Sequence, residues 1–280
     1  MIRKYSRNIA EIVFLLAIVV MGAFFFVEKN EADENVVSQP ADIPEIKVPE
    51  NSTITETQNN ISVPILMYHY IRDYNDPTDK IGVNLSVSPE KFKEQINYLK
   101  NNGYKTITFF DLKNKKVAPL PEKPIILTFD DGYSDAFDAY KMLKENDQVG
   151  VFYIISSFVG RDNVLTTNQI IEMSKNNMEI GSHSKTHPDL TKISDANLKK
   201  ELEDSKKNLE EIIGKSIISF CYPAGKYNQV VKDSVANSEY LFATTTKSGI
   251  AKAGADLISL PRIRITPSDT LESISKKLNK

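Results

Sequence analysis

The stretch "PIILTFDDGYSD", residues 124–135, contains an apolar run that ends directly in two aspartates and a glycine. Such a run, apolar apart from one threonine, is typical of a strand buried on both faces in a parallel sheet. Asp130 and Asp131 therefore lie where the strand should end, and neighbouring carboxylates repel each other unless a cation lies close to them. A turn of the common Asp-Asp-Gly composition, without any function, is the alternative interpretation.

Seven further short runs rich in β-branched and aromatic residues occur in the chain, and helical patterns separate many of them. Residues 88–103 and 194–214 each begin with a capping serine and end in a glycine, as helices do. This alternation predicts a parallel α/β fold, either a barrel or an open doubly wound sheet. The lack of a GxGxxG or Walker-type loop weakens the interpretation as a nucleotide-binding, doubly wound sheet. In a barrel, the catalytic residues lie at the C-terminal ends of the strands. The other strand candidates are residues 63–71, 104–110, 149–155, 177–183, 217–223, 241–246 and 260–265.

The composition is that of an ordinary folded protein. The chain has 280 residues, of which 41% are hydrophobic and 26% charged, and a formal net charge of -2. This is enough for one large domain with its own core or for two small ones, and we expect the protein to be monomeric. The lack of a basic excess argues against nucleic acid as a partner. A single cysteine, Cys221, allows no disulfide within the chain.

Residues 9–27 form an apolar segment that is preceded by basic residues and followed by acidic ones. Its length is close to the roughly 20 residues that cross a bilayer as a helix. Residues 1–8 should stay in the cytoplasm, so we expect a membrane anchor at 9–27, an extracellular linker at 28–62 and a domain at 63–280. A cleaved signal peptide, which would release a secreted protein, is the alternative, although no small-residue cleavage site clearly follows the apolar core.

Two of the three histidines in the chain, His183 and His187, come directly after the strand candidate at 177–183. Glycine, serine and proline around them predict a turn or a very short helix. The spacing places both imidazoles within reach of one ion, and two histidines with one carboxylate suit zinc and leave a position open for water. Because the strand ends at Gly132, the side chains of Asp130 and Asp131 can both lie beside such a site, one as a metal ligand and the other as a base. Two surface histidines without a metal are the alternative.

The motif "TFDDGY" (128–133), followed further along by "HSKTH" (183–187), resembles the polysaccharide deacetylase family, the family 4 carbohydrate esterases with the NodB homology domain. The resemblance covers roughly residues 63–266. It implies a distorted (β/α) barrel of about seven to eight parallel strands that removes acetyl groups from N-acetylglucosamine polymers with a divalent metal. It also implies Asp130 as the catalytic base and Asp131, His183 and His187 as metal ligands. Zinc is the expected ion, with cobalt, nickel or manganese as alternatives.

The third motif of this family usually reads Arg-Pro-Pro-Tyr-Gly, and the matching stretch here is "FCYPAGKYN" (220–228). Pro223 and Gly225 match, and the family's motif forms one wall of the substrate groove. Cys221 stands where the family has an arginine that orients the catalytic base. Arg262 and Arg264 project to the same side of a strand by alternation, and we favour Arg262 as the replacement. A solvated arginine on an edge strand is the alternative for either one.

The family's late Leu-x-His motif supplies a general acid, yet no histidine follows His187 in this chain. His69 ends the first strand candidate of the domain, and a parallel barrel would bring it to the same rim as the other residues. Such an early histidine resembles the circularly permuted arrangement of deacetylases that act on poly-β-1,6-N-acetylglucosamine in biofilms, which implies His69 as the general acid. A core histidine bonded to a neighbouring strand is the alternative.

The expected reaction is metal-assisted amide hydrolysis, in which Asp130 takes a proton from water and His69 donates one to the departing sugar nitrogen. Tyr133, Tyr222 and Tyr227 are candidates for stacking on sugar rings, and a backbone N–H near Tyr222 is a candidate to face the carbonyl oxygen. The expected substrate is an exopolysaccharide of N-acetylglucosamine. A peptidoglycan N-deacetylase and a non-catalytic wall-binding module are the alternatives.

Overall fold

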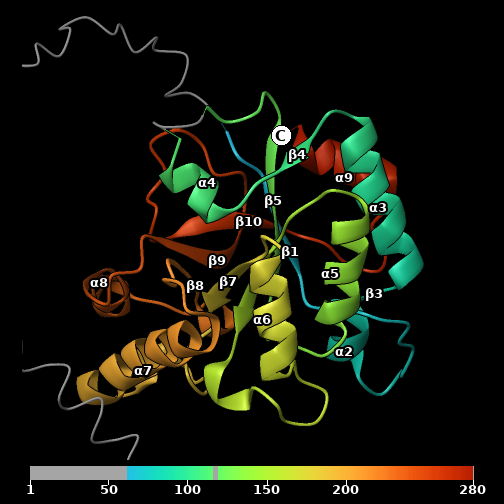
Figure 1. The fold of residues 1–280 in the computed structure, drawn as a ribbon. Coiled ribbons are helices and arrows are strands. Elements are labelled where there is room, and N and C mark those ends of the chain that lie inside the picture. Colours follow the sequence, from blue (N-terminus) through green and yellow to red (C-terminus); the bar gives the residue numbers. More distant parts are fainter. Residues whose placement is uncertain (1–61, 116–118, 280) are drawn as a thin grey trace, which may run out of the picture. The chain divides into compact units, whose positions relative to one another are not determined.

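The computed structural model describes residues 62–115 and 119–279, and its backbone is shown in Figure 1. Seven parallel strands close into a barrel in the order β1-β10-β9-β8-β7-β6-β5, and β5 pairs back with β1. The predicted barrel is therefore confirmed. The strands of the ring are β1 (Ile65–Tyr68), β5 (Pro124–Phe129), β6 (Val151–Ile154), β7 (Glu179–Ser182), β8 (Ser219–Cys221), β9 (Phe242–Ser248) and β10 (Leu260–Arg264).

The eighth strand candidate, residues 104–110, contributes only β4 (Lys105–Thr106), which pairs with the first residues of β5 outside the closed ring. Two further short strands, β2 (Tyr70–Ile71) and β3 (Ser86–Val87), pair with each other beside the barrel. They belong to an excursion of the chain between β1 and the first long helix. This excursion leaves the barrel directly after His69.

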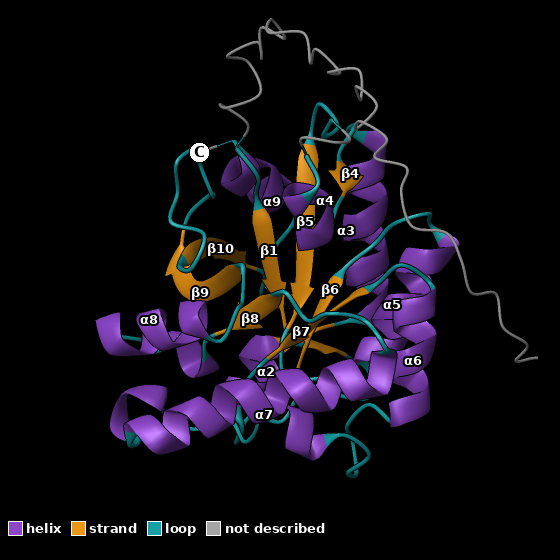
Figure 2. Ribbon diagram, turned by 60° about the vertical axis from the view of Figure 1, so that its left-hand side comes forward, coloured by secondary structure: helices purple, strands orange, loops and turns teal. Residues whose placement is uncertain are grey.

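Helices surround the strands, as Figure 2 shows. The predicted caps are confirmed: Ser88 and Ser194 accept backbone N–H groups at the start of two helices, and Gly214 ends the second in a left-handed conformation (φ 67°). The helices are α2 (Lys80–Leu85), α3 (Pro89–Asn101), α4 (Phe109–Lys113), α5 (Ala136–Glu145), α6 (Thr167–Lys175), α7 (Asp195–Ile213), α8 (Gln229–Asn237) and α9 (Leu271–Leu278). In the part of the chain that the structure describes, three single turns of 3-10 helix occur at Ser156–Phe158, Leu190–Lys192 and Pro223–Gly225.

Most strand residues are buried on both faces of the sheet, apart from the last three of β9, which explains the continuous apolar runs. One set of strand side chains packs outward against the helices, where Tyr68, Phe129 and Phe152 stack in sequence with ring centroids 5.4 and 4.6 Å apart. The alternate set, which includes Ile65 and Tyr153, forms a second buried cluster. Each large apolar side chain buried in this way stabilises the fold by about 1.5–3 kcal/mol.

The predicted cytoplasmic segment, membrane anchor and linker (1–8, 9–27 and 28–62) fall outside the described residues except for Ser62. Among the helices formed by residues 62–115 and 119–279, none combines the length and apolar character needed to cross a bilayer.

A buried carboxylate lies at the end of the barrel opposite to the strand ends that carry the histidines. Glu179, the first residue of β7, accepts backbone N–H groups of Phe109 (2.8 Å) and Phe110 (3.2 Å) at the start of α4. Its other oxygen accepts the Ser219 hydroxyl at 2.5 Å. Burial raises the pKa of Glu179 to about 7, although these three hydrogen bonds oppose the shift. The native state therefore binds this proton more tightly than the unfolded chain does.

We expect the contribution of Glu179 to stability to fall as the pH rises from about 4.5 to about 7. In this window the folded protein holds a proton that the unfolded chain has lost, so each step up in pH favours unfolding. Glu179→Gln should flatten the pH dependence, and the wild-type-minus-variant difference should change by about 2–3 kcal/mol across the window. Urea unfolding at a series of pH values measures this. Equal slopes for the two proteins would contradict the assignment.

Candidate active site and metal centre

The C-terminal ends of three strands bring the predicted polar residues together. His69 follows β1, Asp130 and Asp131 follow β5, and His183 follows β7. The Nε2 atom of His69 lies 3.8 Å from Oδ2 of Asp130. The Nε2 atoms of His183 and His187 lie 3.3 and 3.6 Å from the same oxygen, Oδ1 of Asp131. The structure therefore places all five side chains in one cluster at the rim of the barrel.

Asp131, His183 and His187 form a group that fits a divalent ion, because their ligand atoms all lie within 4.8 Å of one another. Nδ1 of His183 is 2.7 Å from the carbonyl oxygen of Cys221. A carbonyl oxygen can only accept, so Nδ1 carries a hydrogen, and Nε2 is the nitrogen that faces Asp131 and could ligate an ion. Such a second partner is typical of a histidine that ligates a metal.

The backbone around these residues adopts conformations that cost free energy. Asp131, Ser184 and His187 have φ values of 74°, 64° and 61°, in the left-handed region that residues other than glycine rarely adopt. The Ser184 hydroxyl holds the turn by accepting the N–H of His187 at 2.9 Å. The HxxxH segment is thus a turn, as its composition predicted. Strain of this kind clusters at functional sites.

A second group, Asp130, His183 and Cys221, also has ligand atoms within this distance. It fits an ion less well, because both oxygens of Asp130 already accept hydrogen bonds from Arg262. The nitrogen of His183 that faces Cys221 is likewise occupied by the Cys221 carbonyl oxygen. We therefore take the Asp131 group as the candidate metal centre.

Arg262, on β10, forms a two-pronged ion pair with Asp130. Its Nη1 and Nη2 atoms each donate to one oxygen of that carboxylate at 2.7 Å, and the arginine is fully buried. Nε donates to the Thr245 carbonyl oxygen (2.9 Å), and Nη1 also donates to the Thr128 hydroxyl (2.9 Å). Cys221, which occupies the position of the family's arginine, lies 3.2 Å from Nη2. Parallel donors of this kind fix the orientation of the carboxylate.

Sequence reasoning missed Thr128, although its signal was present. It is the one polar residue in the apolar run before Asp130, and it lies two positions earlier, so alternation puts it on the same side of β5. Its hydroxyl donates to the Leu66 carbonyl oxygen at 2.7 Å and accepts from Arg262. Thr128 therefore helps to hold the arginine in place.

The electrostatics of the cluster keep both carboxylates ionised. Burial alone would raise the pKa of Asp130, but the charge and hydrogen bonds of Arg262 outweigh it and hold that pKa well below its usual range. Burial also opposes ionisation of Asp131, yet the hydrogen bond and charge of His183 lower its pKa. Burial lowers the pKa of His69, while the two carboxylates oppose that shift.

The four residues expected to bind substrate have different surroundings. Tyr133 is half-buried and stacks on Tyr70 with ring centroids 3.8 Å apart. The side chain of Tyr222 is fully buried and donates to the Ile258 carbonyl oxygen at 2.9 Å, so its predicted role in stacking on a sugar is wrong. Its N–H donates to the Thr244 carbonyl oxygen at 3.2 Å and is not free for an oxyanion.

Pro223 and Gly225 form the turn after β8. Pro223 is buried, and Gly225 has a φ of 68°. A Cβ added at Gly225 would lie 1.9 Å from the Thr246 hydroxyl oxygen, so glycine is required there for packing. This close contact is sufficient to explain the glycine without any contact to a substrate.

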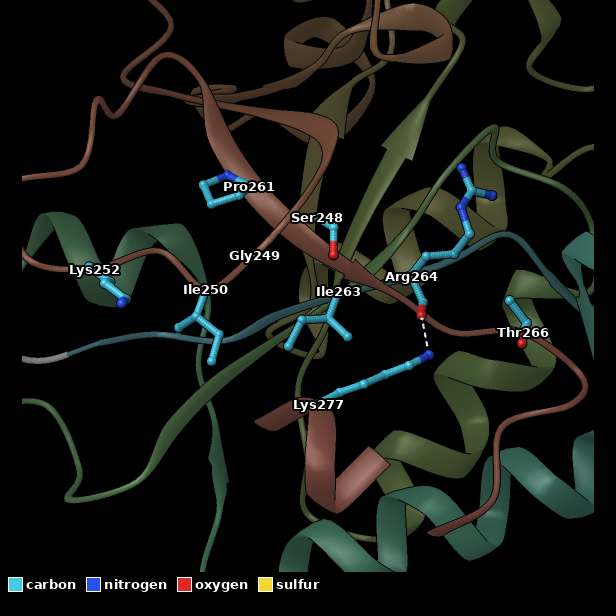
Figure 3. A pocket seen from close by; sticks show the side chains of 9 residues that line it. All are labelled: Ser248, Gly249, Ile250, Lys252, Pro261, Ile263, Arg264, Thr266 and Lys277. Carbon is cyan, nitrogen blue, oxygen red and sulfur yellow. Dashed lines mark hydrogen bonds between the residues drawn. The ribbon is translucent and has the colours of Figure 1, made fainter. Parts of the chain in front are cut away.

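A separate cavity of about 600 Å³ lies away from the cluster, and Figure 3 shows the side chains that line it. Ile250, Pro261 and Ile263 provide apolar walls, and Lys277 donates to the Arg264 carbonyl oxygen at 3.0 Å. None of the five clustered residues lines this cavity. We therefore place the candidate active site at the rim cluster and not at this cavity.

Comparisons with known proteins agree with this geometry. The family model for polysaccharide deacetylase matches residues 117–243. A polysaccharide deacetylase structure from Bacillus cereus is 34% identical, with a TM-score of 0.72, and the match covers 78% of this chain and 69% of that one. The Streptococcus pyogenes deacetylase PplD, solved in complex with acetate, is 32% identical with a TM-score of 0.73, covering 78% and 99%. A poly-β-1,6-N-acetyl-D-glucosamine N-deacetylase of Staphylococcus aureus is 24% identical over 280 residues, covering 94% and 96%. The chain thus belongs to the polysaccharide deacetylase family.

Proposed function

We propose that this protein is a metal-dependent N-deacetylase of an extracellular N-acetylglucosamine polymer, and specifically of poly-β-1,6-N-acetylglucosamine. The observation that carries the proposal is the position of His69, whose Nε2 atom lies 3.8 Å from Asp130. His69 and Arg262 both lie outside the region that the family model matches, one on each side of it. The similarity to the Staphylococcus aureus enzyme supports the choice of the β-1,6 polymer.

Asp131, His183 and His187 would hold the divalent ion, with zinc as the metal that best suits two imidazoles and one carboxylate. Cobalt, nickel and manganese are the alternatives. When bound, the ion supplies Lewis-acid chemistry, which acidifies water and polarises the acetyl carbonyl group. The hydrogen bond from His183 to the Cys221 carbonyl oxygen would keep this ligand in its binding orientation.

Asp130 would act as the base that takes a proton from the attacking water. Because Arg262 lowers its pKa, the carboxylate stays ionised at neutral pH but is a weak base. A weak base can accept a proton only from water that is itself acidified, which makes the carboxylate dependent on the neighbouring metal centre. Arg262 would act as a positioning residue that aims Asp130 without touching the substrate.

His69 would donate a proton to the sugar nitrogen as the C–N bond breaks. An amine is a poor leaving group unless it is protonated, so this step needs an acid at the rim. The imidazole is 14% exposed, which leaves it accessible from the side where a polymer would lie. The Asp130 carboxylate favours its protonated form, in opposition to burial.

Two other functions remain as alternatives. A peptidoglycan N-deacetylase would use the same chemistry on a β-1,4 chain. A non-catalytic wall-binding module is disfavoured, because the ion pair of Arg262 with Asp130 supplies the interaction that Cys221 cannot. We further propose that residues 9–27 anchor a monomeric enzyme in the membrane with its domain outside the cell, or that the protein is secreted if the segment is cleaved.

Acetate release from two polymers in parallel tests the proposed function. The metal-loaded protein should release acetate from poly-β-1,6-N-acetylglucosamine at least ten times faster than from β-1,4-linked peptidoglycan glycan chains. The reverse preference would favour the peptidoglycan enzyme. Acetate from neither polymer would favour the binding module and reject the proposal.

Asp130→Asn should lose turnover by at least about 100-fold while keeping its metal, because the amide cannot accept the proton of water. The variant should also unfold at a lower temperature, since the buried Arg262 loses its ion pair. Acetate release and metal content by mass spectrometry measure the two effects. Asp138→Asn, which changes an exposed carboxylate on α5, is the control. Full activity of Asp130→Asn would reject the base assignment.

His69→Ala should keep its full metal content and lose turnover by about 100-fold or more, because the leaving nitrogen no longer receives a proton. The loss should shrink for a substrate whose leaving group needs no proton, such as an aryl acetate ester. Both rates and the bound metal are measured on the same preparation. If the variant loses its metal, His69 is a ligand and not the acid.

A further inference from the structure

A stack of four side chains begins at the catalytic cluster and runs along the chain excursion that follows β1. Tyr133 stacks on Tyr70 with centroids 3.8 Å apart and ring planes 16° apart. The guanidinium carbon of Arg72 lies 3.5 Å from the centre of the Tyr70 ring and 4.1 Å from that of Tyr74. Arg72 is therefore held between two tyrosine rings. We call this set, Tyr133, Tyr70, Arg72 and Tyr74, the tyrosine–arginine stack.

The stack adjoins the reacting residues directly. Tyr70 follows His69 in the chain, and Tyr133 lies two positions after Asp131. A sugar next to the one that reacts would therefore lie within reach of this stack.

Hydrogen bonds hold the stack in place. Nε of Arg72 donates to the Ser86 hydroxyl at 3.1 Å, and that hydroxyl donates to the Gly82 carbonyl oxygen at 2.7 Å. The Tyr74 hydroxyl donates to Asp79 at 3.1 Å. Asp135, at the start of α5, accepts the N–H of Ile71 at 3.0 Å and so ties the excursion to the loop after β5. Arg72 is thus a fixed cation on a rigid support.

The charge of Arg72 is available to a ligand. The Tyr70 and Tyr74 rings both lie against the guanidinium, and Nε already donates to Ser86, so the Nη groups are the donors that remain. Within residues 62–115 and 119–279, no carboxylate forms a salt bridge with Arg72. The side chain is half-buried, which leaves its edge open to solvent.

We propose that Arg72 selects the sugar beside the reacting one, accepting an N-acetylated neighbour and rejecting a neighbour that carries a free amine. The proposal rests on the proposed function and adds a specificity-determining residue to it. An acetamide is neutral, and its carbonyl oxygen can accept an Nη–H bond. Deacetylation converts that group into an ammonium ion, which a fixed guanidinium repels. The product of one turnover therefore hinders the next turnover on the adjacent sugar.

The size of the effect follows from the charges. Two unit positive charges about 6 Å apart disfavour binding by about 3-fold in a water-like medium and about 100-fold at the effective dielectric of a protein surface. A half-buried arginine lies between these limits, so we expect about a tenfold preference for the acetylated neighbour. The preference should weaken as salt is added, because the groups are partly exposed.

The test compares two β-1,6-linked pentamers with the full-length protein in detergent: one fully N-acetylated, the other with free amines on alternate sugars. The ratio of kcat/KM for the two, from acetate release, should be about 10 for the wild type. Arg72→Gln keeps hydrogen-bond donors without the charge and should bring the ratio close to 1. Arg72→Lys keeps the charge and should keep most of the preference. A matched control is Lys123→Gln. Lys123 directly precedes β5, and its Nζ atom lies 5.8 Å from the centre of the Tyr104 ring. This variant also removes a cation beside a tyrosine and should leave the ratio at about 10.

The outcomes separate this proposal from the one on which it rests. A wild-type ratio near 1, an unchanged ratio in Arg72→Gln, or an equal loss of turnover on both pentamers in that variant would overturn the role of Arg72 while the deacetylase stands. Release of acetate from neither pentamer by the wild type would reject the β-1,6 deacetylase itself, and the role of Arg72 with it.

Discussion

The buried ion pair between Arg262 and Asp130 is the interaction on which the rest of the site depends. Its arginine comes from β10 and its aspartate follows β5, and β1 lies between these two strands in the barrel. The pair therefore spans the inner side of β1, and His69 follows that same strand. Withdrawing two charges from water costs several kcal/mol for each, and this site offsets the cost with further hydrogen bonds that Arg262 donates to the Thr128 hydroxyl and the Thr245 carbonyl oxygen. The carboxylate is consequently held in one orientation, ionised, beside a histidine and a candidate metal centre.

Much of this arrangement could be predicted from the sequence, because it follows from the lengths of the apolar runs and from the alternation of side chains along strands. Continuous apolar runs located the seven strands of the ring, and polar residues at their ends marked the rim. Alternation along 260–265 put Arg262 and Arg264 on the same side of the strand as candidate partners of Asp130, and the structure shows that Arg262 forms the ion pair. The pairing of β10 with β9 shifts register between Leu260 and Arg262, which no sequence period indicates. The run at 104–110 looked the same as the others, yet it contributes only two strand residues, because its following segment turns into α4. The pattern of apolar residues along the sequence cannot distinguish a strand of the closed barrel from a short strand, such as β4, that pairs outside it.

The features that sequence reasoning missed or misplaced depend on contacts between distant segments. Tyr222 lies in a motif that suggested a groove wall, but its ring packs against Phe220 and Tyr227 and its hydroxyl reaches residue 258. The tyrosine–arginine stack is built from the excursion after β1 and the loop after β5, and nothing in the spacing of its members predicts that they meet. In the sequence, Glu179 is indistinguishable from an ordinary strand residue. Only the structure shows that its carboxylate accepts the backbone N–H of Phe109 at the start of α4. Each of these features has at least one partner far away in the chain, which no local pattern could indicate: Ile258 for Tyr222, Tyr133 for Tyr70 and Phe109 for Glu179.

Because β1 closes the ring of strands, the strands of the barrel must pair in a certain order during folding. Leu66 pairs with Ile263 on one side and with Leu127 on the other, so the first strand of the ring can be fully paired only after the last one has formed. Contacts between such distant segments form late and slowly, because a long loop must be closed before they contribute. His69 and Arg262 arrive with these two strands, whereas the three candidate metal ligands lie in the middle of the sequence. A chain in which β10 has not yet paired with β1 would thus lack the Arg262–Asp130 ion pair and would hold His69 on an incompletely paired strand, so hydrolytic competence would coincide with completion of the fold.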